Sequence, residues 1–555
     1  MANLTRRFNQ RIPMRDGVTL AADLTLPAEL PAPAVVLRTP YGKTGELQNK
    51  RAETFAAGGY VAVLVDVRGR GDSDGEFTPY AADGPDGYDV IEWVASQEWC
   101  TGAVATWGGS YGGHIQWLAA LEKPPSLKAM VTLVTPSDPF VENPTGLPTP
   151  MSINWFRLVD ARVPQHTDNV DWMSVYAHRP LLTMDEAAGF VSDNWRETLR
   201  HSTLDEFWEP HRYQHRIAEV DVPVLHISGW YDDEEIGTPL NFASLVDAGR
   251  DGQRLLMGPW GHQVNTTRKL GEVDFGPDAL IDLDGVTLAF LDEHVKGESE
   301  AVAAPAAPVR IFLMGANEWL DEQSWPPAGA VEQTWWLASE GRANSLFGDG
   351  RLVSESGSGS ASGASDTWTH DPDRPVPFVT GASSSQIGGP DDYYGVETRG
   401  DVLVYTSDVF SEPVDLIGPV RFVGHVSTSA ADADVVAMLL DVHPNNFVQR
   451  LCDGMVRLRF RDGHRSQSEV RPGESYAIDI AMWDTCHRLL PGHRLRLQIT
   501  ASAFPKHDVN LGTGGDMISE TDGVIATQTL WHDAERPSRL VVTALNSVSR
   551  PRRRR

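Results

Sequence analysis

Apolar positions in the first 130 residues follow two alternating patterns. Short β-branched apolar runs bounded by turn residues are typical of buried strands, and longer segments between them repeat apolar residues at helical spacing. The expected strands are residues 18–26, 34–38, 60–67, 103–107 and 127–134, and the expected helices are residues 46–57 and 84–96. This alternation predicts a mostly parallel sheet with helices on both faces.

The alternation stops between about residues 137 and 218, which are rich in Trp, Pro, Asp, Arg and His and contain helix-like stretches without a clear strand. It resumes with a strand at 222–227, a helix-like segment at 240–248, a strand at 254–258 and a helix at 278–295. The pattern predicts a helical insertion. Insertions at the carboxyl ends of strands commonly cover the active site of an open α/β sheet, so we expect this one to form a cap.

The pattern changes again after residues 296–308, which read as a linker rich in Ala, Pro and Glu. Short strand-like runs divided by turn signals follow, and they predict an all-β sandwich or jelly roll. These runs are residues 309–314, 402–405, 420–423, 435–440, 455–460, 495–500 and 540–542, and residues 354–365 between them, almost all Ser, Gly and Ala, read as a flexible loop. The expected domains are an α/β domain (1–136 and 221–300), a helical cap (137–220) and a β domain (309–555).

The amino-acid composition excludes some classes of function. The chain has 555 residues, 41% of them hydrophobic and 22% charged, as in an ordinary folded protein. The net charge of −29 argues against a nucleic-acid-binding protein, which would carry a basic surface. Cys100, Cys452 and Cys486 lie far apart and predict neither a disulfide framework nor a cysteine metal site.

No targeting or membrane segment is expected. Residues 1–17 lack the apolar core of a signal peptide, and no run approaches the 18 apolar residues of a membrane span. We therefore expect a cytoplasmic protein that binds neither membrane nor nucleic acid, and we interpret the basic residues 550–555 as a solvated end.

The segment Gly108-Gly109-Ser110-Tyr111-Gly112-Gly113 carries the first chemical signal. It follows an expected strand and opens an apolar helical run. Strand, Gly-x-Ser-x-Gly and helix together are the sequence form of a nucleophile elbow, in which a tight turn exposes a serine hydroxyl above the sheet. The chain matches the bare pattern a second time around Ser73, but in a polar stretch without a helix directly behind it, so we interpret that match as a loop.

A serine nucleophile needs a histidine base and an acid that orients it, and in α/β hydrolases they follow in the order Ser, Asp or Glu, His. Asp232 follows the strand at 222–227, and His262 follows the strand at 254–258, thirty residues later. That interval suits one helix and one strand, which would bring the two side chains together. The neighbouring acids Asp233, Glu234 and Glu235 are more typical of a solvated cluster, and the alternative for His262 is a structural histidine.

The developing oxyanion needs hydrogen-bond donors. The residue after the nucleophile, Tyr111, normally gives its backbone N–H. The loop after the strand at 34–38 lacks a glycine run that would present backbone amides, but it contains Tyr41. From the residues alone, Tyr41 is either a hydroxyl donor or an aromatic residue that packs at a turn.

These residues match a family. The chain resembles the cocaine esterase-like serine hydrolases (the CocE/NonD group), relatives of X-Pro dipeptidyl peptidases, glutaryl acylases and α-amino acid ester hydrolases. The matching segments, which cover nearly the whole chain apart from the cap, are residues 38–41, 66–71, 107–113, 229–232, 258–262, 503–510 and 513–515.

The resemblance implies Ser110 as nucleophile, Asp232 as orienting acid and His262 as base, with oxyanion contacts from Tyr41 and the Tyr111 amide. It also implies an α/β-hydrolase domain, a helical cap and a carboxyl-terminal jelly roll, the domain found at the end of X-Pro dipeptidyl peptidases. The expected reaction is hydrolysis of a small carboxylic ester through an acyl-enzyme, with neither metal nor organic cofactor.

Two other functions stay open. An amide or peptide hydrolase would use the same triad, with Asp233, Glu234 or Glu235 holding a substrate amino group, and a non-catalytic binding protein would use the jelly roll. Trp230 and Trp260 flank the catalytic loops and either line an acyl pocket or pack the loops in place. The jelly roll also offers faces for a homodimer. Aromatic residues of the cap are candidates for pocket walls or for helix packing, namely Trp155, Phe156, Trp172, Trp195, Phe207 and Trp208.

Overall fold

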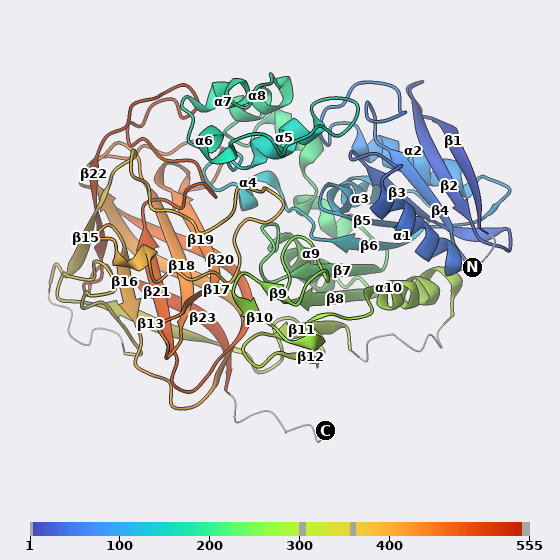
Figure 1. Cartoon of the computed structure of the whole chain (residues 1–555). Helices are drawn as coiled ribbons and strands as arrows, with labels where there is room; N and C mark the ends of the chain where they lie inside the picture. Colours follow the sequence, from blue (N-terminus) through green and yellow to red (C-terminus); the bar gives the residue numbers. More distant parts are fainter. Residues whose placement is uncertain (1–3, 299–306, 356–361, 547–555) are drawn as a thin grey trace.

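The computed structural model describes residues 4–298, 307–355 and 362–546. Three sequence expectations fall wholly or mainly outside these residues: most of the linker at 296–308, the centre of the Ser/Gly segment at 354–365 and the basic end at 550–555. Figure 1 shows the first sheet on the right, a β-rich domain on the left and a group of short helices across the top.

The first sheet has ten strands in the order β1-β2-β4-β3-β5-β6-β7-β8-β11-β12, and its central strands are parallel. Strand β4 is buried along its whole length, as expected for a parallel strand covered on both faces. The strands are β1 (Thr5–Pro13), β2 (Thr19–Leu26), β3 (Ala32–Thr39), β4 (Val61–Asp66), β5 (Cys100–Gly109), β6 (Leu127–Leu133), β7 (Val224–Gly229), β8 (Gln253–Gly258), β11 (Val309–Leu313) and β12 (Glu318–Glu322).

Helices cover both faces of this sheet. Val90 of α2 and Trp117 of α3 belong to the apolar core on one face, and Phe55 of α1 and Phe290 of α10 belong to the core on the other. The helices of this domain are α1 (Glu46–Ala57), α2 (Asp83–Ala95), α3 (Tyr111–Leu121), α9 (Gly237–Asp247) and α10 (Leu283–Leu291). The predicted α/β class is confirmed.

The first strand expected for the β domain belongs to the first sheet instead. The sequence predicts that residues 309–314 open the jelly roll, but β11 pairs in parallel with β8, with Val309 opposite Leu255 and Ile311 opposite Met257. Strand β12 then pairs antiparallel with β11 at the edge of the same sheet. A short apolar run fits either sheet equally well, and only its hydrogen-bonding partner decides which one it joins.

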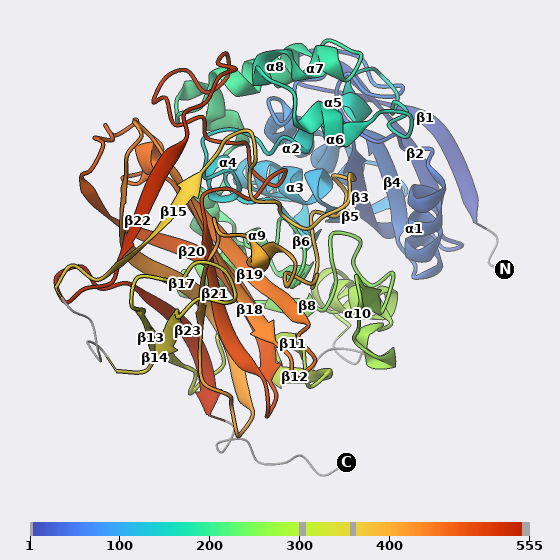
Figure 2. The same ribbon diagram turned by 60° about the vertical axis from the view of Figure 1, so that its left-hand side comes forward.

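The cap lies between β6 and β7. Its helices are short, namely α4 (Pro139–Glu142), α5 (Ser152–Val159), α6 (Trp172–Tyr176), α7 (Met184–Ala187) and α8 (Asp193–Arg200), and 3-10 turns at Glu206–His211 and Gln214–Glu219 follow them. Met151 and Trp195 of the cap share one apolar core with Phe378 and Met438 of the β-rich part. Figure 2 shows the cap extending over both other domains.

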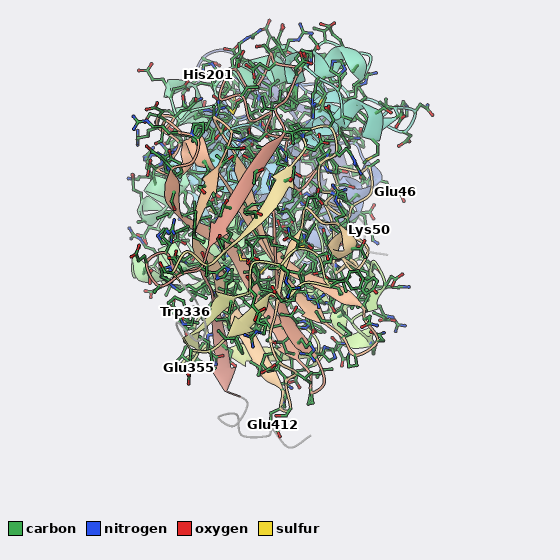
Figure 3. The ribbon with its side chains drawn as sticks, turned by 90° about the vertical axis from the view of Figure 1, so that its left-hand side faces the viewer. Glu46, Lys50, His201, Trp336, Glu355 and Glu412 are labelled. Carbon is green, nitrogen blue, oxygen red and sulfur yellow. The ribbon has the colours of Figure 1, made fainter. Side chains whose placement is uncertain are left out.

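Eleven further strands form one sheet that folds around its own apolar core, with β17 and β20 as its longest pair, and β9 (Lys269–Leu270) and β10 (Val273–Asp274) form a separate two-stranded sheet. The strands are β13 (Val331–Ala338), β14 (Arg351–Val353), β15 (Ser365–His370), β16 (Leu403–Thr406), β17 (Val414–Thr428), β18 (Asp434–Val442), β19 (Val448–Arg457), β20 (Ser475–Leu489), β21 (Arg494–Thr500), β22 (Ala526–Trp531) and β23 (Arg539–Asn546). In Figure 3, His201 at the end of α8 lies near the top and Trp336 of β13 lies in the lower half. Among the described residues, no helix is long and apolar enough to cross a membrane.

Candidate active site

Ser110 occupies the sharp turn between β5 and α3. Its backbone has φ 55° and ψ −126°, a conformation that costs energy for a residue with a side chain. The turn is held by the Ser110 N–H, which donates to the Leu133 carbonyl at 2.9 Å, and by the Ser110 carbonyl, which accepts from His114 N–H at 2.9 Å. A Cβ on Gly108 would lie 2.5 Å from the backbone of Gly112, so glycine is required where strand and helix meet. This is the geometry of a nucleophile elbow.

Ser73, the second match to the serine pattern, has a different environment. Its side chain is fully buried, its hydroxyl donates to the Asp66 carbonyl at 2.6 Å, and it accepts from the Ala21 N–H at 2.9 Å. Both hydrogen bonds hold a loop against the sheet. Ser73 therefore has a structural role.

Asp232 and His262 meet at the carboxyl ends of β7 and β8. Nδ1 of His262 donates to Oδ1 of Asp232 at 2.8 Å, and the Ser228 hydroxyl donates to Oδ2 of Asp232 at 2.7 Å. The Asp232 side chain is completely buried, so its charge is held in place by these two donors. An acid that fixes one ring nitrogen of a histidine leaves the other free to act as a base.

Carboxylates surround His262. Burial works to lower the pKa of His262, but the charges of Asp232, Glu234 and Asp233 favour the imidazolium and hold its pKa well above the usual range. Burial raises the pKa of Asp233 to about 6, against the opposing charge of His262, and raises the pKa of Glu234 well above its usual value. The site thus concentrates carboxyl groups beside its base.

The side chain of Tyr41 lies next to Ser110. Burial raises the pKa of Tyr41 to about 12, so its hydroxyl is neutral and can donate. The Trp155 indole N–H donates to the Tyr41 oxygen at 3.0 Å.

Tyr111 follows Ser110 as the first residue of α3, a position whose backbone N–H has no partner within the helix. The Tyr111 hydroxyl donates instead to Asp83, away from the serine. Only the backbone of Tyr111 is therefore available as an oxyanion donor.

A cavity of about 760 Å³ connects these groups. Ser110, Tyr41 and His262 all line it, together with the carboxylates of Glu142, Asp233 and Glu234. Its volume suits a small organic substrate. The elements therefore bring the predicted nucleophile, base and oxyanion donor to one cavity.

The two loop tryptophans do not line this cavity. The Trp230 indole N–H donates to the Phe312 carbonyl at 2.9 Å, and the Trp260 indole N–H donates to the Ala279 carbonyl at 2.8 Å. Both rings are buried in the protein core. Of the two alternatives left open for these residues, the structure favours the second: they pack the catalytic loops in place and do not line the cavity.

The cap aromatics divide into two groups. Trp155, Phe156 and Trp208 line the cavity, whereas Trp172, Trp195 and Phe207 pack elsewhere within the cap.

Several residues of the site are not predicted from the sequence. Glu142 comes from α4 of the cap, and Trp483 and Lys506 come from the β-rich domain. Gln386, from a loop before β16, accepts from the His262 backbone N–H at 3.2 Å and donates to the Tyr231 carbonyl at 3.1 Å. Lys506 lies in the family-like segment at 503–510, which was the available signal; no local pattern indicated Glu142 or Gln386.

Two groups of described side chains have donor atoms close enough to consider a metal, namely Asp441 with His443 and His493, and Asp232 with Asp233 and His262. Asp441 already accepts hydrogen bonds from His493 at 2.8 Å and from His487 at 2.9 Å. Asp232 and His262 likewise bind each other. The expectation that neither metal nor cofactor takes part stays a prediction.

Comparisons with known proteins agree with this architecture. The family described as X-Pro dipeptidyl-peptidase (S15 family) matches residues 16–264, and the X-Pro dipeptidyl-peptidase C-terminal non-catalytic domain matches residues 301–541. The cocaine esterase of Rhodococcus sp. (strain MB1 Bresler) is 34% identical, and the alignment covers 97% of this chain and 98% of that protein.

Solved structures share the whole fold. An aminopeptidase from a marine sediment archaeon, Thaumarchaeota archaeon, superposes with a TM-score of 0.86 at 25% identity, over 98% of this chain and 97% of the other. An α-amino acid ester hydrolase superposes with a TM-score of 0.87 at 24% identity, again over 98% and 97% of the two chains. At that identity the second similarity concerns the fold alone.

Proposed function

We propose, since the chain belongs to the cocaine esterase-like (CocE/NonD) family of serine hydrolases, that it cleaves carboxylic esters with Ser110 as nucleophile, His262 as base and Asp232 as orienting acid. The chain is a serine hydrolase of ester substrates. The observation that carries the assignment of residues is the 2.8 Å bond between His262 and Asp232, at a cavity that also contains the elbow serine.

The first half of the reaction forms an acyl-enzyme. His262 takes the proton of the Ser110 hydroxyl as the serine oxygen attacks the ester carbonyl carbon. The negative charge that develops on the carbonyl oxygen receives hydrogen bonds from the Tyr41 hydroxyl and the Tyr111 backbone N–H. The carbon–oxygen bond to the alcohol then breaks, and His262 returns the proton to the leaving alcohol.

The second half releases the acid. A water molecule gives its proton to His262 and attacks the carbonyl carbon of the acylated serine. The same donors stabilise the second oxyanion, the bond to Ser110 breaks, and the serine oxygen regains its proton from His262. Asp232 orients and stabilises the imidazolium in both halves.

Steady-state hydrolysis of 4-nitrophenyl acetate tests the nucleophile. We expect Ser110→Ala to lower kcat/KM by at least about a thousandfold, because nucleophile removal leaves only binding and oxyanion contacts. Ser73→Ala is the matched control, since it alters the other serine of the same pattern, and the folded variant should keep its activity. Equal activity of Ser110→Ala and wild type would remove Ser110 from the mechanism.

A second proposal concerns the substrate class, and it rests on the anionic wall of the cavity. Glu142, Asp233 and Glu234 face the same space as Ser110, and oxygens of Asp233 and Glu234 have no hydrogen-bond partner. Burial raises the pKa of Glu142 well above its usual value. Because a buried carboxylate is stabilised by a cation, we propose that the cavity favours esters with an ammonium group near the carbonyl. The name of the aminopeptidase agrees with such a class.

Matched esters test this substrate class. Alanine benzyl ester and benzyl propionate differ only in the amino group, and we expect a higher kcat/KM for the alanine ester. Glu234→Gln should remove about tenfold of that preference and leave benzyl propionate nearly unchanged. Equal kcat/KM values for the two esters in the wild type, or an equal loss of kcat/KM with both esters in Glu234→Gln, would contradict the proposed substrate class. Faster cleavage of an alanyl-proline anilide than of either ester would favour the peptidase alternative.

A further inference from the structure

The oxyanion donor Tyr41 receives a hydrogen bond from another domain. Tyr41 belongs to the loop after β3, whereas Trp155 belongs to α5 of the cap, and the indole Nε1 lies 3.0 Å from the Tyr41 oxygen. Both side chains line the cavity that contains Ser110. The cap therefore contacts the oxyanion donor Tyr41 directly, in addition to lining the cavity.

This contact limits the directions of the Tyr41 O–H bond. An indole N–H can only donate, so the phenol oxygen accepts, and its single proton must point elsewhere. A phenol that accepts one hydrogen bond is also polarised into a stronger donor. The Tyr41 hydroxyl is thus prepared to donate toward the carbonyl oxygen of a substrate attached to Ser110.

The ring of Trp155 is held by its neighbours. It stacks on Tyr111, with ring centroids 6.1 Å apart and an interplanar angle of 24°. Phe156 packs edge-on against it, with centroids 5.1 Å apart. A side chain fixed on two sides can hold its N–H at a constant place.

We propose that Trp155 is a positioning residue that orients the Tyr41 hydroxyl for oxyanion stabilisation. The position of the cap on the α/β domain then affects the rate of the chemical step. The proposal rests on the proposed function of the Ser110 site. Two effects distinguish a positioning residue from a residue that only lines the cavity. Substitution of Trp155 should change kcat, and it should do so only when Tyr41 is present.

A double-mutant cycle with 4-nitrophenyl acetate tests the proposal, using the wild type, Trp155→Phe, Tyr41→Phe and the double variant. We expect Trp155→Phe to lower kcat by about tenfold with little change in KM, and Tyr41→Phe to lower kcat by about a hundredfold or more. The double variant should match Tyr41→Phe, because the indole has no hydroxyl left to orient.

Trp172→Phe is the matched control. Trp172 also lies in the cap, and its indole N–H donates to the Thr167 carbonyl at 2.8 Å, so the variant loses a comparable hydrogen bond without contact to Tyr41. We expect its kcat to stay within about twofold of the wild type. If Trp155→Phe does not fold, benzothienylalanine at position 155 keeps the indole shape with sulfur in place of N–H and takes its place in the cycle.

Two results would overturn the proposal. Losses that multiply in the double variant would show that Trp155 acts independently of Tyr41, and a raised KM at constant kcat would make it a wall residue only. Failure of the proposed function is separately visible, because Ser110→Ala would then keep its activity in the same assay.

Discussion

At the scale of single residues, charge around His262 is the property with the clearest consequence. Asp233 Oδ1 lies 3.7 Å from Nδ1 of His262. A base acts only in its neutral form, and the nearby carboxylates favour the protonated form. Activity should therefore rise with pH until His262 loses its proton, at a pH above the ordinary histidine range.

The pH dependence of kcat/KM gives a prediction for Asp233. Its pKa of about 6 means that the carboxylate is ionised at pH 7. Asp233→Asn removes this charge, the imidazolium loses stabilisation, and the pKa of His262 falls. We expect the acid limb of the profile to move to lower pH. The exposed surface variant Asp251→Asn should leave the limb in place, and a limb that stays unchanged or moves to higher pH in Asp233→Asn would contradict the argument.

The position of the site residues after successive strands was sufficient to predict that they meet in one cavity, because parallel strands end at the same edge of the sheet. Chain position says little about side-chain direction, however. Trp230 and Trp260 flank the catalytic loops as expected, yet both rings turn into the core. Glu142 could not be predicted either, because its approach to the cavity depends on how the cap folds back. The catalytic roles themselves stay predictions.

At the scale of elements, the main difference from the prediction concerns the sheet to which β11 belongs. Its apolar residues resemble the strands of the β-rich domain, but it extends the first sheet beyond β8. Strand order in a sheet is a long-range property that local patterns do not encode. Strand β20 was not predicted either, because exposed and buried residues alternate in its first half and polar residues interrupt the apolar pattern.

A core substitution in β11 tests its place in the sheet. Ile311 is completely buried and pairs with Met257 of β8. Ile311→Ala should lower the free energy of unfolding by about 2–4 kcal/mol, since it removes packed methyl groups and leaves a cavity. Val331→Ala in β13, half exposed, is the control and should cost less than about 0.5 kcal/mol. Urea unfolding followed by tryptophan fluorescence measures both, and equal small effects would argue against a buried β11.

At the scale of the whole molecule, three domains contribute to one cavity. The first sheet supplies Ser110 and His262, the cap supplies Trp155 and Glu142, and the β-rich domain supplies Lys506. The predicted fold class is confirmed. The arrangement of the three domains around Ser110 could not be predicted from the periodicity or the motifs of the sequence. It depends on packing between segments that are hundreds of residues apart.

The central claim is that Ser110, activated by His262, forms a covalent bond to its substrate. Mass spectrometry of the protein after treatment with a fluorophosphonate tests it most directly, because the reagent labels an activated serine. We expect a single adduct on the peptide containing Ser110, lost in Ser110→Ala, much slower in His262→Ala and retained in Ser73→Ala. No adduct on the wild type, or an adduct that persists in Ser110→Ala, would contradict the claim.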